Sequence, residues 1–216
     1  MTTIALWTLL HVLVFVYWLG GDLGAYYTSR YIYAADHEVP ARVLAAKVLS
    51  DVDMAPRTAL ILAFPTGLAL AAAKGWIAVH PIFVIGAFVA AGLWIVLAFV
   101  LHMDSSPTLA TTDLVLRWAF VAALAAVGIA ALVGSVSLPR FIALKLLILA
   151  FAALMGLTIR RLLRPFGPAF GRLVTEGPSP DVDAALRRTI TTARPFVLAI
   201  WAALVAAAWL GIATPV

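Results

Sequence analysis

The sequence contains no cysteine and few charged residues. Because none of its 216 residues is a cysteine, disulfides, thiolate metal sites, iron–sulfur clusters and cysteine nucleophiles are excluded. Charged residues make up 12% and hydrophobic residues 64% of the chain, against about 25% and about 45–50% in ordinary globular proteins. A soluble fold with so little charge could not cover its own surface. The composition therefore predicts an all-α, polytopic membrane protein, a transmembrane helical bundle with lipid as its solvent.

Signatures of hydrolases and nucleotide-binding proteins are missing as well. The chain has no Ser–His–Asp arrangement, no His-x-x-Glu-His motif and no carboxylate pair, so hydrolytic chemistry has no support. The glycine-rich segment 19–24 follows no strand and matches no phosphate-binding loop; in a membrane helix such glycines more often mark close packing. The net charge is +5, but the basic residues are confined to a few loops. This pattern indicates orientation in a membrane and argues against nucleic-acid binding.

Six apolar segments are long enough to cross a bilayer, whose hydrocarbon core requires about 20 residues of helix. The predicted spans are residues 3–27, 54–73, 81–102, 109–133, 138–163 and 193–212. We expect a short helix after Pro40, an interruption of the second span at residues 64–67, and a polar stretch at 164–188 that lies on the membrane surface. There is no internal repeat, so residues 1–216 are expected to form a single integral membrane domain.

The orientation of the bundle follows from its arginines. Seven arginines lie between residues 160 and 194, and the positive-inside rule places such a stretch in the cytoplasm. An even number of spans then puts both chain termini on the periplasmic side. The first apolar segment lacks a basic leader and a small-residue cleavage site, so it is expected to be retained. Abundant arginine and alanine indicate a bacterial protein, hence the bacterial inner membrane.

A polar stripe runs along the first span. His11, Trp18, Asp22 and Ser29 are separated by seven, four and seven residues, so at about 100° per residue they share one face of the helix. Ionisable side chains within an apolar span usually face the bundle interior. Two interpretations stay open for the stripe. His11 is a metal or haem ligand, or His11 and Asp22 are simply hydrogen-bonded between helices.

Other candidate ligands are Lys145, His80 and His102. Lys145 and His11 lie at matching depth, roughly 10–12 Å inside the periplasmic ends of their spans, so both could contact one anionic ligand such as a porphyrin propionate. Alternatively, Lys145 extends to the membrane surface. His80 and His102 bracket the third span. His80 suits the role of second axial ligand beside His11, whereas His102 could bind a second, cytoplasmic-side haem; either could also be an interfacial histidine without a ligand.

Several short motifs follow a pattern known from one group of membrane proteins. They are His11, Trp18 and Gly21 in the first span, the run 30–33 ending near His37, Pro56-Arg57 and Thr66-Gly67 in the second span, and residues 143–147 in the fifth. These motifs resemble the HemJ-type protoporphyrinogen oxidases, whose broad superfamily includes the CopD-like membrane proteins. The resemblance covers about half of the chain. It implies a haem b (protohaem IX) protein with His11 as the leading ligand candidate and Lys145, Arg30 and Arg57 in supporting roles.

Three functions are compatible with these observations. The leading hypothesis is a haem b-binding membrane protein that acts in electron transfer or porphyrin oxidation. Such a protein would be an oxidoreductase and would pass electrons to a quinone or another redox membrane protein. The second is transport of copper or another small solute, although no cysteine and only four methionines offer soft ligands. The third is a homo-oligomer, accessory subunit or assembly factor of a larger membrane complex.

Overall fold

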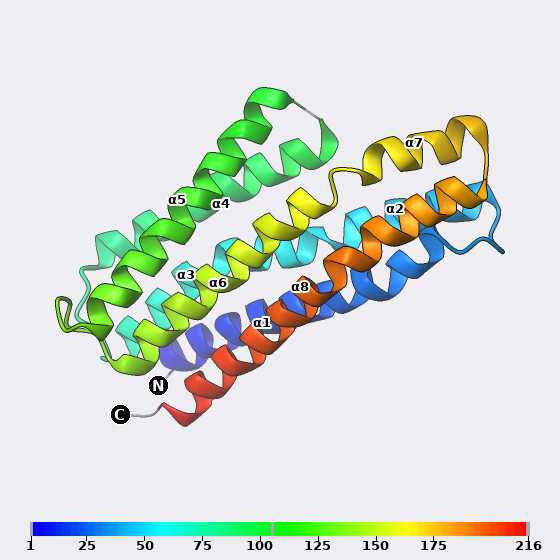
Figure 1. Ribbon diagram of the computed structural model, residues 1–216. Helices are drawn as coiled ribbons and strands as arrows, with labels where there is room; N and C mark the ends of the chain where they lie inside the picture. Colours follow the sequence, from blue (N-terminus) through cyan, green and yellow to red (C-terminus); the bar gives the residue numbers. More distant parts are fainter. Residues whose placement is uncertain (1, 105, 215–216) are drawn as a thin grey trace.

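The computed structural model describes residues 2–104 and 106–214, and within these residues it forms eight helices (Figure 1). Their bounds are α1 Thr2–Ile32, α2 Val39–Val52, α3 Met54–Ala73, α4 Pro81–Met103, α5 Pro107–Leu132, α6 Arg140–Leu162, α7 Phe166–Glu176 and α8 Pro180–Ala213. Six segments are long and apolar enough to cross a membrane, with α2 and α3 counted as one. The prediction of an all-α, multi-pass membrane protein is confirmed.

Proline marks the beginning of several helices. Pro81, Pro107 and Pro180 are the first residues of α4, α5 and α8. Proline fits this position because the N–H groups of the first turn have no partner inside the helix. The short helix predicted after Pro40 is confirmed as α2, in which that proline is the second residue. The helices of spans two to five begin within two residues of the predicted positions.

Two helices continue through proline, and one of them contradicts a prediction. The second span is not interrupted at residues 64–67, because α3 continues through Pro65. Thr66 donates its hydroxyl to the carbonyl of Leu62 at 2.7 Å, and such local bonds help membrane helices to accommodate proline. The sixth predicted span, residues 193–212, lies within α8, which runs without a break from Pro180 to Ala213 and passes through Pro195. At 1.5 Å per residue, a helix of 34 residues is about 51 Å long, so it extends beyond a hydrocarbon core of about 30 Å.

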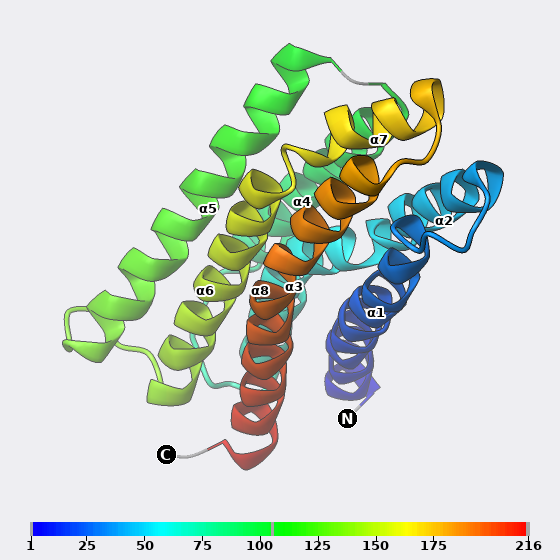
Figure 2. The same cartoon turned by 45° about the vertical axis from the view of Figure 1, so that its right-hand side comes forward.

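The long helices pack as two layers, with α1, α3 and α4 in one and α5, α6 and α8 in the other (Figures 1 and 2). Buried side chains of α1, α3, α6 and α8 form the core between the layers. α1 packs along α3, α6 lies between α5 and α8, and α4 contacts α3. Both chain termini lie at the same end of the bundle, which we call the termini end. The opposite end, where α1 and α6 finish and where Arg57, Arg160 and Arg194 lie, is called the basic end.

Close approaches of α1 to α2 and to α3 fix the register of α1 against these two helices. A Cβ atom built on Gly21 would lie 2.5 Å from Cδ of Pro56, and one built on Gly24 would lie 2.9 Å from a methyl group of Val52. A larger side chain at residue 21 would therefore force the helices apart. The interpretation of segment 19–24 as a close-packing segment is confirmed at Gly21 and Gly24, whereas a Cβ atom on Gly20 would meet no atom within 4 Å.

A small helical cap covers the basic end. It is formed by α2, α7 and the first turns of α8, and Val182, Leu173 and Leu186 are almost completely buried within it. Arg42 is fully buried: it donates to the carbonyl of Ile32 at 2.7 Å and forms an ion pair with Asp183 at 2.6 Å. This pair joins α2 to α8, so it holds together two walls of the region described next.

Candidate functional site

Two cavities lie one above the other along the bundle. The first has a volume of about 430 Å³, lies toward the termini end and is lined by His11, Lys145 and mostly apolar side chains. The second, of about 580 Å³, lies toward the basic end and is lined by several arginines and aspartates. Trp18 and Ala152 line both cavities. The two spaces therefore adjoin near the middle of the bundle.

In the termini-end cavity, His11 is held by a hydrogen bond between helices. Its Nδ1 lies 2.9 Å from Oγ1 of Thr66. Because that hydroxyl donates its own hydrogen to the carbonyl of Leu62, Oγ1 accepts from Nδ1–H, and we assign the proton of the neutral imidazole to Nδ1. Nε2 is then the nitrogen that carries the lone pair. Metal-binding histidines commonly have this arrangement, with the second ring nitrogen donating to a neighbouring oxygen.

Gly67 supplies the room that the imidazole needs. A Cβ atom at this position would lie 3.2 Å from Cε1 of His11, tighter than ordinary van der Waals contact. The Thr66-Gly67 pair, which the sequence marks as a helix break, thus serves to bind and seat the imidazole. The same hydrogen bond is compatible with the alternative interpretation, in which His11 is only a packing residue. It occupies one of the two ring nitrogens, Nδ1.

Lysines provide the charge in this cavity. Lys145 lines it together with His11, so the structure brings these two predicted residues to one space. The ammonium of Lys145 lies near α8, where a Cβ on Gly211 would be 2.9 Å from Nζ. Lys74, which sequence reasoning missed, lies at the edge of the cavity with its Nζ 4.5 Å from the ring centre of Trp76. No carboxylate lines the cavity among residues 2–104 and 106–214, so its charge suits an anion.

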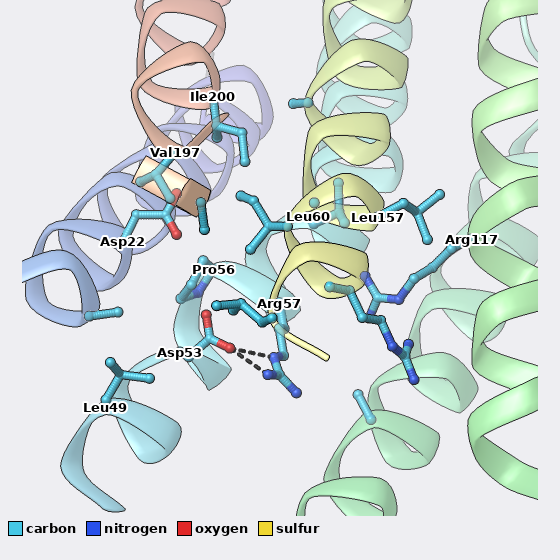
Figure 3. Close-up of a pocket in the computed structure, with 18 of the residues that line it drawn as sticks. Asp22, Leu49, Asp53, Pro56, Arg57, Leu60, Arg117, Leu157, Val197 and Ile200 are labelled. Atoms are coloured by element: carbon cyan, nitrogen blue, oxygen red, sulfur yellow. Dashed lines mark hydrogen bonds and ion pairs between the residues drawn. The ribbon is translucent and has the colours of Figure 1, made fainter. Parts of the chain in front are cut away.

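The basic-end cavity contains acid–base pairs (Figure 3). Arg57 contacts Asp53 with both Nη2, at 2.5 Å, and Nε, at 2.7 Å. Asp113 is almost completely buried and accepts three hydrogen bonds: from Trp94 at 3.0 Å, Arg117 at 2.9 Å and Arg160 at 2.7 Å. These contacts tie α4, α5 and α6 together at the basic end.

Asp22 lies deeper in the same cavity, on α1 (Figure 3). Its Oδ2 atom is buried and has no hydrogen-bond partner in the part of the chain that the structure describes. Trp18, one turn away, is 4% exposed and Ser29 is 7% exposed. The prediction that the stripe of the first span faces the bundle interior is therefore confirmed, but His11 and Asp22 face different cavities.

Three predicted site residues lie apart from both cavities. His80 is exposed at the beginning of α4, where its Nδ1 accepts a hydrogen bond from the N–H of Ile82. His102 contacts Asp51 at 3.1 Å, and Arg30 donates to the carbonyl of Tyr27. The structure thus does not bring His80 or His102 to His11. Within the described ranges, no cluster of three or more His, Asp or Glu side chains could bind a metal ion.

Several lining residues were not predicted as parts of a site. Asp113 and Arg117 are four residues apart, a spacing that indicates a helical ion pair, but nothing in the sequence links them to Arg160. In the sequence, Arg194 indicates only the orientation of the chain in the membrane, as one of the arginines between residues 160 and 194. Its Nη2 donates to the hydroxyl of Tyr33 at 2.7 Å, and its Nε is buried without a partner in the described residues.

Comparison with known proteins adds no relationship. No protein-family model matches the chain, and neither a curated protein nor a solved structure matches it.

Proposed function

We propose that this protein binds haem b in the termini-end cavity, with His11 as the axial ligand, and acts in electron transfer or porphyrin oxidation. The observation that carries the proposal is the position of His11. Its imidazole is oriented through Nδ1 by Thr66 in an apolar cavity, beside a lysine. A histidine inside an apolar span is costly unless it has a partner or a function. Here the hydrogen bond favours the tautomer that binds iron through Nε2.

The residues present fit a porphyrin. The macrocycle requires apolar walls, and the cavity provides Phe15, Leu149 and Leu204 among others. Its two propionates require cations, and Lys145 and Lys74 line the same cavity. Bound haem would supply one-electron chemistry at iron. The chain itself would hold the group, orient it through His11 and exclude water with its apolar side chains.

The absence of a second histidine at the cavity sharpens the proposal. His80 and His102 lie elsewhere, so among the described residues His11 is the one imidazole that lines this space. A single histidine ligand favours substrate or oxygen chemistry over simple electron carriage. In either case a quinone or another redox membrane protein would exchange electrons with the site.

Absorption spectroscopy of the purified full chain tests the proposal. After expression with ample haem, we expect a Soret band in the oxidised protein and, after dithionite reduction, the single broad visible band of ferrous haem with one histidine ligand. His11→Ala should lower haem affinity by more than about 100-fold, beyond the 10–100-fold typical of outer-shell changes. His102→Ala, the matched control on the surface, should keep its haem. A colourless wild-type protein, or full haem in His11→Ala, would refute the proposal.

The orientation in the bacterial inner membrane is part of the proposal, with the basic end in the cytoplasm. Because the chain has no cysteine, single cysteines can report it. Ser135 and Thr175 are exposed at the termini end and in the cap, respectively. A membrane-impermeant maleimide should label Ser135→Cys in cells with a permeabilised outer membrane and spare Thr175→Cys. The reverse labelling would invert the topology.

A second candidate function is transport of a small solute. The observation in its favour is that the two cavities adjoin at Trp18 and Ala152 and approach opposite ends of the bundle. Adjoining cavities near the middle of a helical bundle, with charged residues in their walls, are compatible with a transport pathway. Copper is disfavoured as the solute, since the chain has four methionines and no cysteine. Uptake by reconstituted vesicles without bound haem would favour transport; haem-loaded protein without uptake would exclude it.

A further inference from the structure

The basic-end cavity has a graded chemistry from one side to the other. At its mouth lie Arg57, Arg160 and Arg194, at the basic ends of the spans formed by α3, α6 and α8. Toward the middle of the bundle the walls are mostly apolar, and they include Leu60 and Ile200 beside the carboxylate of Asp22 (Figure 3). On α6, eight residues separate Arg160 from Ala152, which corresponds to about 12 Å along the helix. A charged mouth and an apolar interior are complementary to an amphiphile.

The charges at the mouth are unequal. Four arginines and two aspartates lie there, an excess of two positive charges at the mouth; the residues are Arg57, Arg117, Arg160, Arg194, Asp53 and Asp113. A third aspartate, Asp22, lines the deeper part of the same cavity. Arg57 and Asp53 form one pair. Asp113 is shared by two arginines, which leaves one positive charge uncompensated.

Arg194 provides the second uncompensated charge. Its hydrogen-bond partner is the neutral hydroxyl of Tyr33, and its guanidinium carbon lies 5.0 Å from the ring centre of Tyr26. No carboxylate of the described residues forms an ion pair with it, and its buried Nε lacks a partner there. A buried guanidinium N–H without an acceptor is costly, so an anionic ligand would relieve this cost.

We propose that the basic-end cavity binds a phosphomonoester amphiphile, with the phosphate at Arg160 and Arg194 and the apolar chain between α3, α6 and α8. A phosphomonoester carries about two negative charges near neutral pH, which equals the excess at the mouth. Guanidinium groups match phosphate oxygens in geometry as well as charge, and basic pockets between membrane helices recognise anionic lipid head groups. This site is separate from the haem cavity, so either proposal can fail alone.

Native mass spectrometry of delipidated full-length protein tests the site. The probes are dioctanoyl phosphatidic acid, dioctanoyl phosphatidylglycerol, dioctanoyl phosphatidylcholine and inorganic phosphate. We expect affinity to fall in that order among the lipids, by about fivefold per lost charge, and inorganic phosphate to bind more weakly than phosphatidic acid. Equal binding of phosphatidylcholine would overturn the charge argument, and inorganic phosphate binding as tightly as phosphatidic acid would overturn the amphiphile.

Paired variants separate the two halves of the site. Arg160→Gln and Arg194→Gln should each weaken phosphatidic acid binding about fivefold, whereas exposed Arg161→Gln should not. Asp113 keeps Arg117 and Trp94 in the first variant, so the fold should survive, which circular dichroism and gel filtration would verify. Equal effects of Arg160→Gln and Arg161→Gln would overturn the site.

A glycine substitution tests the apolar half without changing any charge. Gly156 lines the cavity, and a Cβ atom there meets no atom within 4 Å. Gly156→Leu should therefore occupy the space of the chain and weaken phosphatidic acid binding while leaving inorganic phosphate unaffected. Gly86→Leu on α4, also in open space but outside the cavity, is the matched control. If both variants bind phosphatidic acid like the wild type, the chain does not lie in this cavity.

Discussion

The two cavities differ in how their charges are compensated. At the basic end, Asp53 and Asp113 pair with three of the four arginines at the mouth, so its positive charge is compensated in part. In the termini-end cavity, Lys145 and Lys74 line the space with His11, and no acid of the described residues does so. Charges near a membrane interface can be paired and hydrated at little cost, whereas a cation deeper in the span requires a partner. The contrast teaches that the lysines depend on a ligand for all of their compensating negative charge, whereas the arginines depend on one only in part.

The largest effect should come from the buried pair that supports the basic-end cavity. Arg42→Ala leaves Asp183 without its partner and the carbonyl of Ile32 without its donor. Removal of one partner of a buried pair costs about 3–5 kcal/mol, so the denaturation midpoint in detergent should fall sharply. Exposed Arg172→Ala, which breaks a surface pair with Glu176, is the control. If both variants unfold alike, Arg42 does not hold the cap.

Loss of the hydrogen bond to His11 should have the next largest effect. Thr66→Val keeps the size of the side chain but removes the hydroxyl that accepts from Nδ1. Haem affinity should fall about 10–100-fold, as for other outer-shell partners of metal-binding histidines. Titration of apoprotein with haem measures it. Thr58→Val on the same helix, whose hydroxyl contacts only backbone carbonyls, should bind haem normally.

Removal of the charge of Lys145 tests whether a ligand compensates the lysines of the termini-end cavity. Lys145→Gln keeps a polar side chain of similar length without the charge, and haem affinity should fall about tenfold, because hydrogen bonds to charged groups contribute roughly 1.5–3 kcal/mol. Lys47→Gln, at an exposed position on α2, is the control. If Lys145→Gln binds haem as tightly as the wild type does, while the wild type binds haem dimethyl ester more weakly than haem, the propionates would be assigned to Lys74. If neither the substitution nor the esterification lowers the affinity, the electrostatic part of the haem proposal would be refuted.

The smallest effect should come from the exposed pair at the basic end. Arg57 and Asp53 have side chains that are 47% and 30% exposed, and pairs of this kind contribute about 0.2–1 kcal/mol. Arg57→Ala should therefore shift the denaturation midpoint only slightly and leave haem content unchanged. A loss comparable with that of Arg42→Ala would show that the pair is shielded from solvent, and the comparison between the cavities would then have to be revised.

The sequence predicted a substantial part of the candidate site. The helical spacing of His11, Trp18 and Asp22 identified an interior face, and the depth of Lys145 matched that of His11; the structure brings both to one cavity. It could not reveal that Thr66 binds the imidazole, since the two residues are 55 positions apart. Likewise, Asp113 and Arg160 are 47 positions apart, and nothing local couples them.

The sequence by itself determined the number of helical segments long and apolar enough to cross a membrane, because backbone groups in lipid must be hydrogen-bonded within each helix. It also determined which face of the first span is polar. The tertiary structure alone decided that Pro65 and Pro195 stay inside helices, that His80 lies apart from His11, and that Arg42 meets Asp183. These outcomes depend on which helices pack together and how they rotate, and packing joins side chains that are distant in the chain.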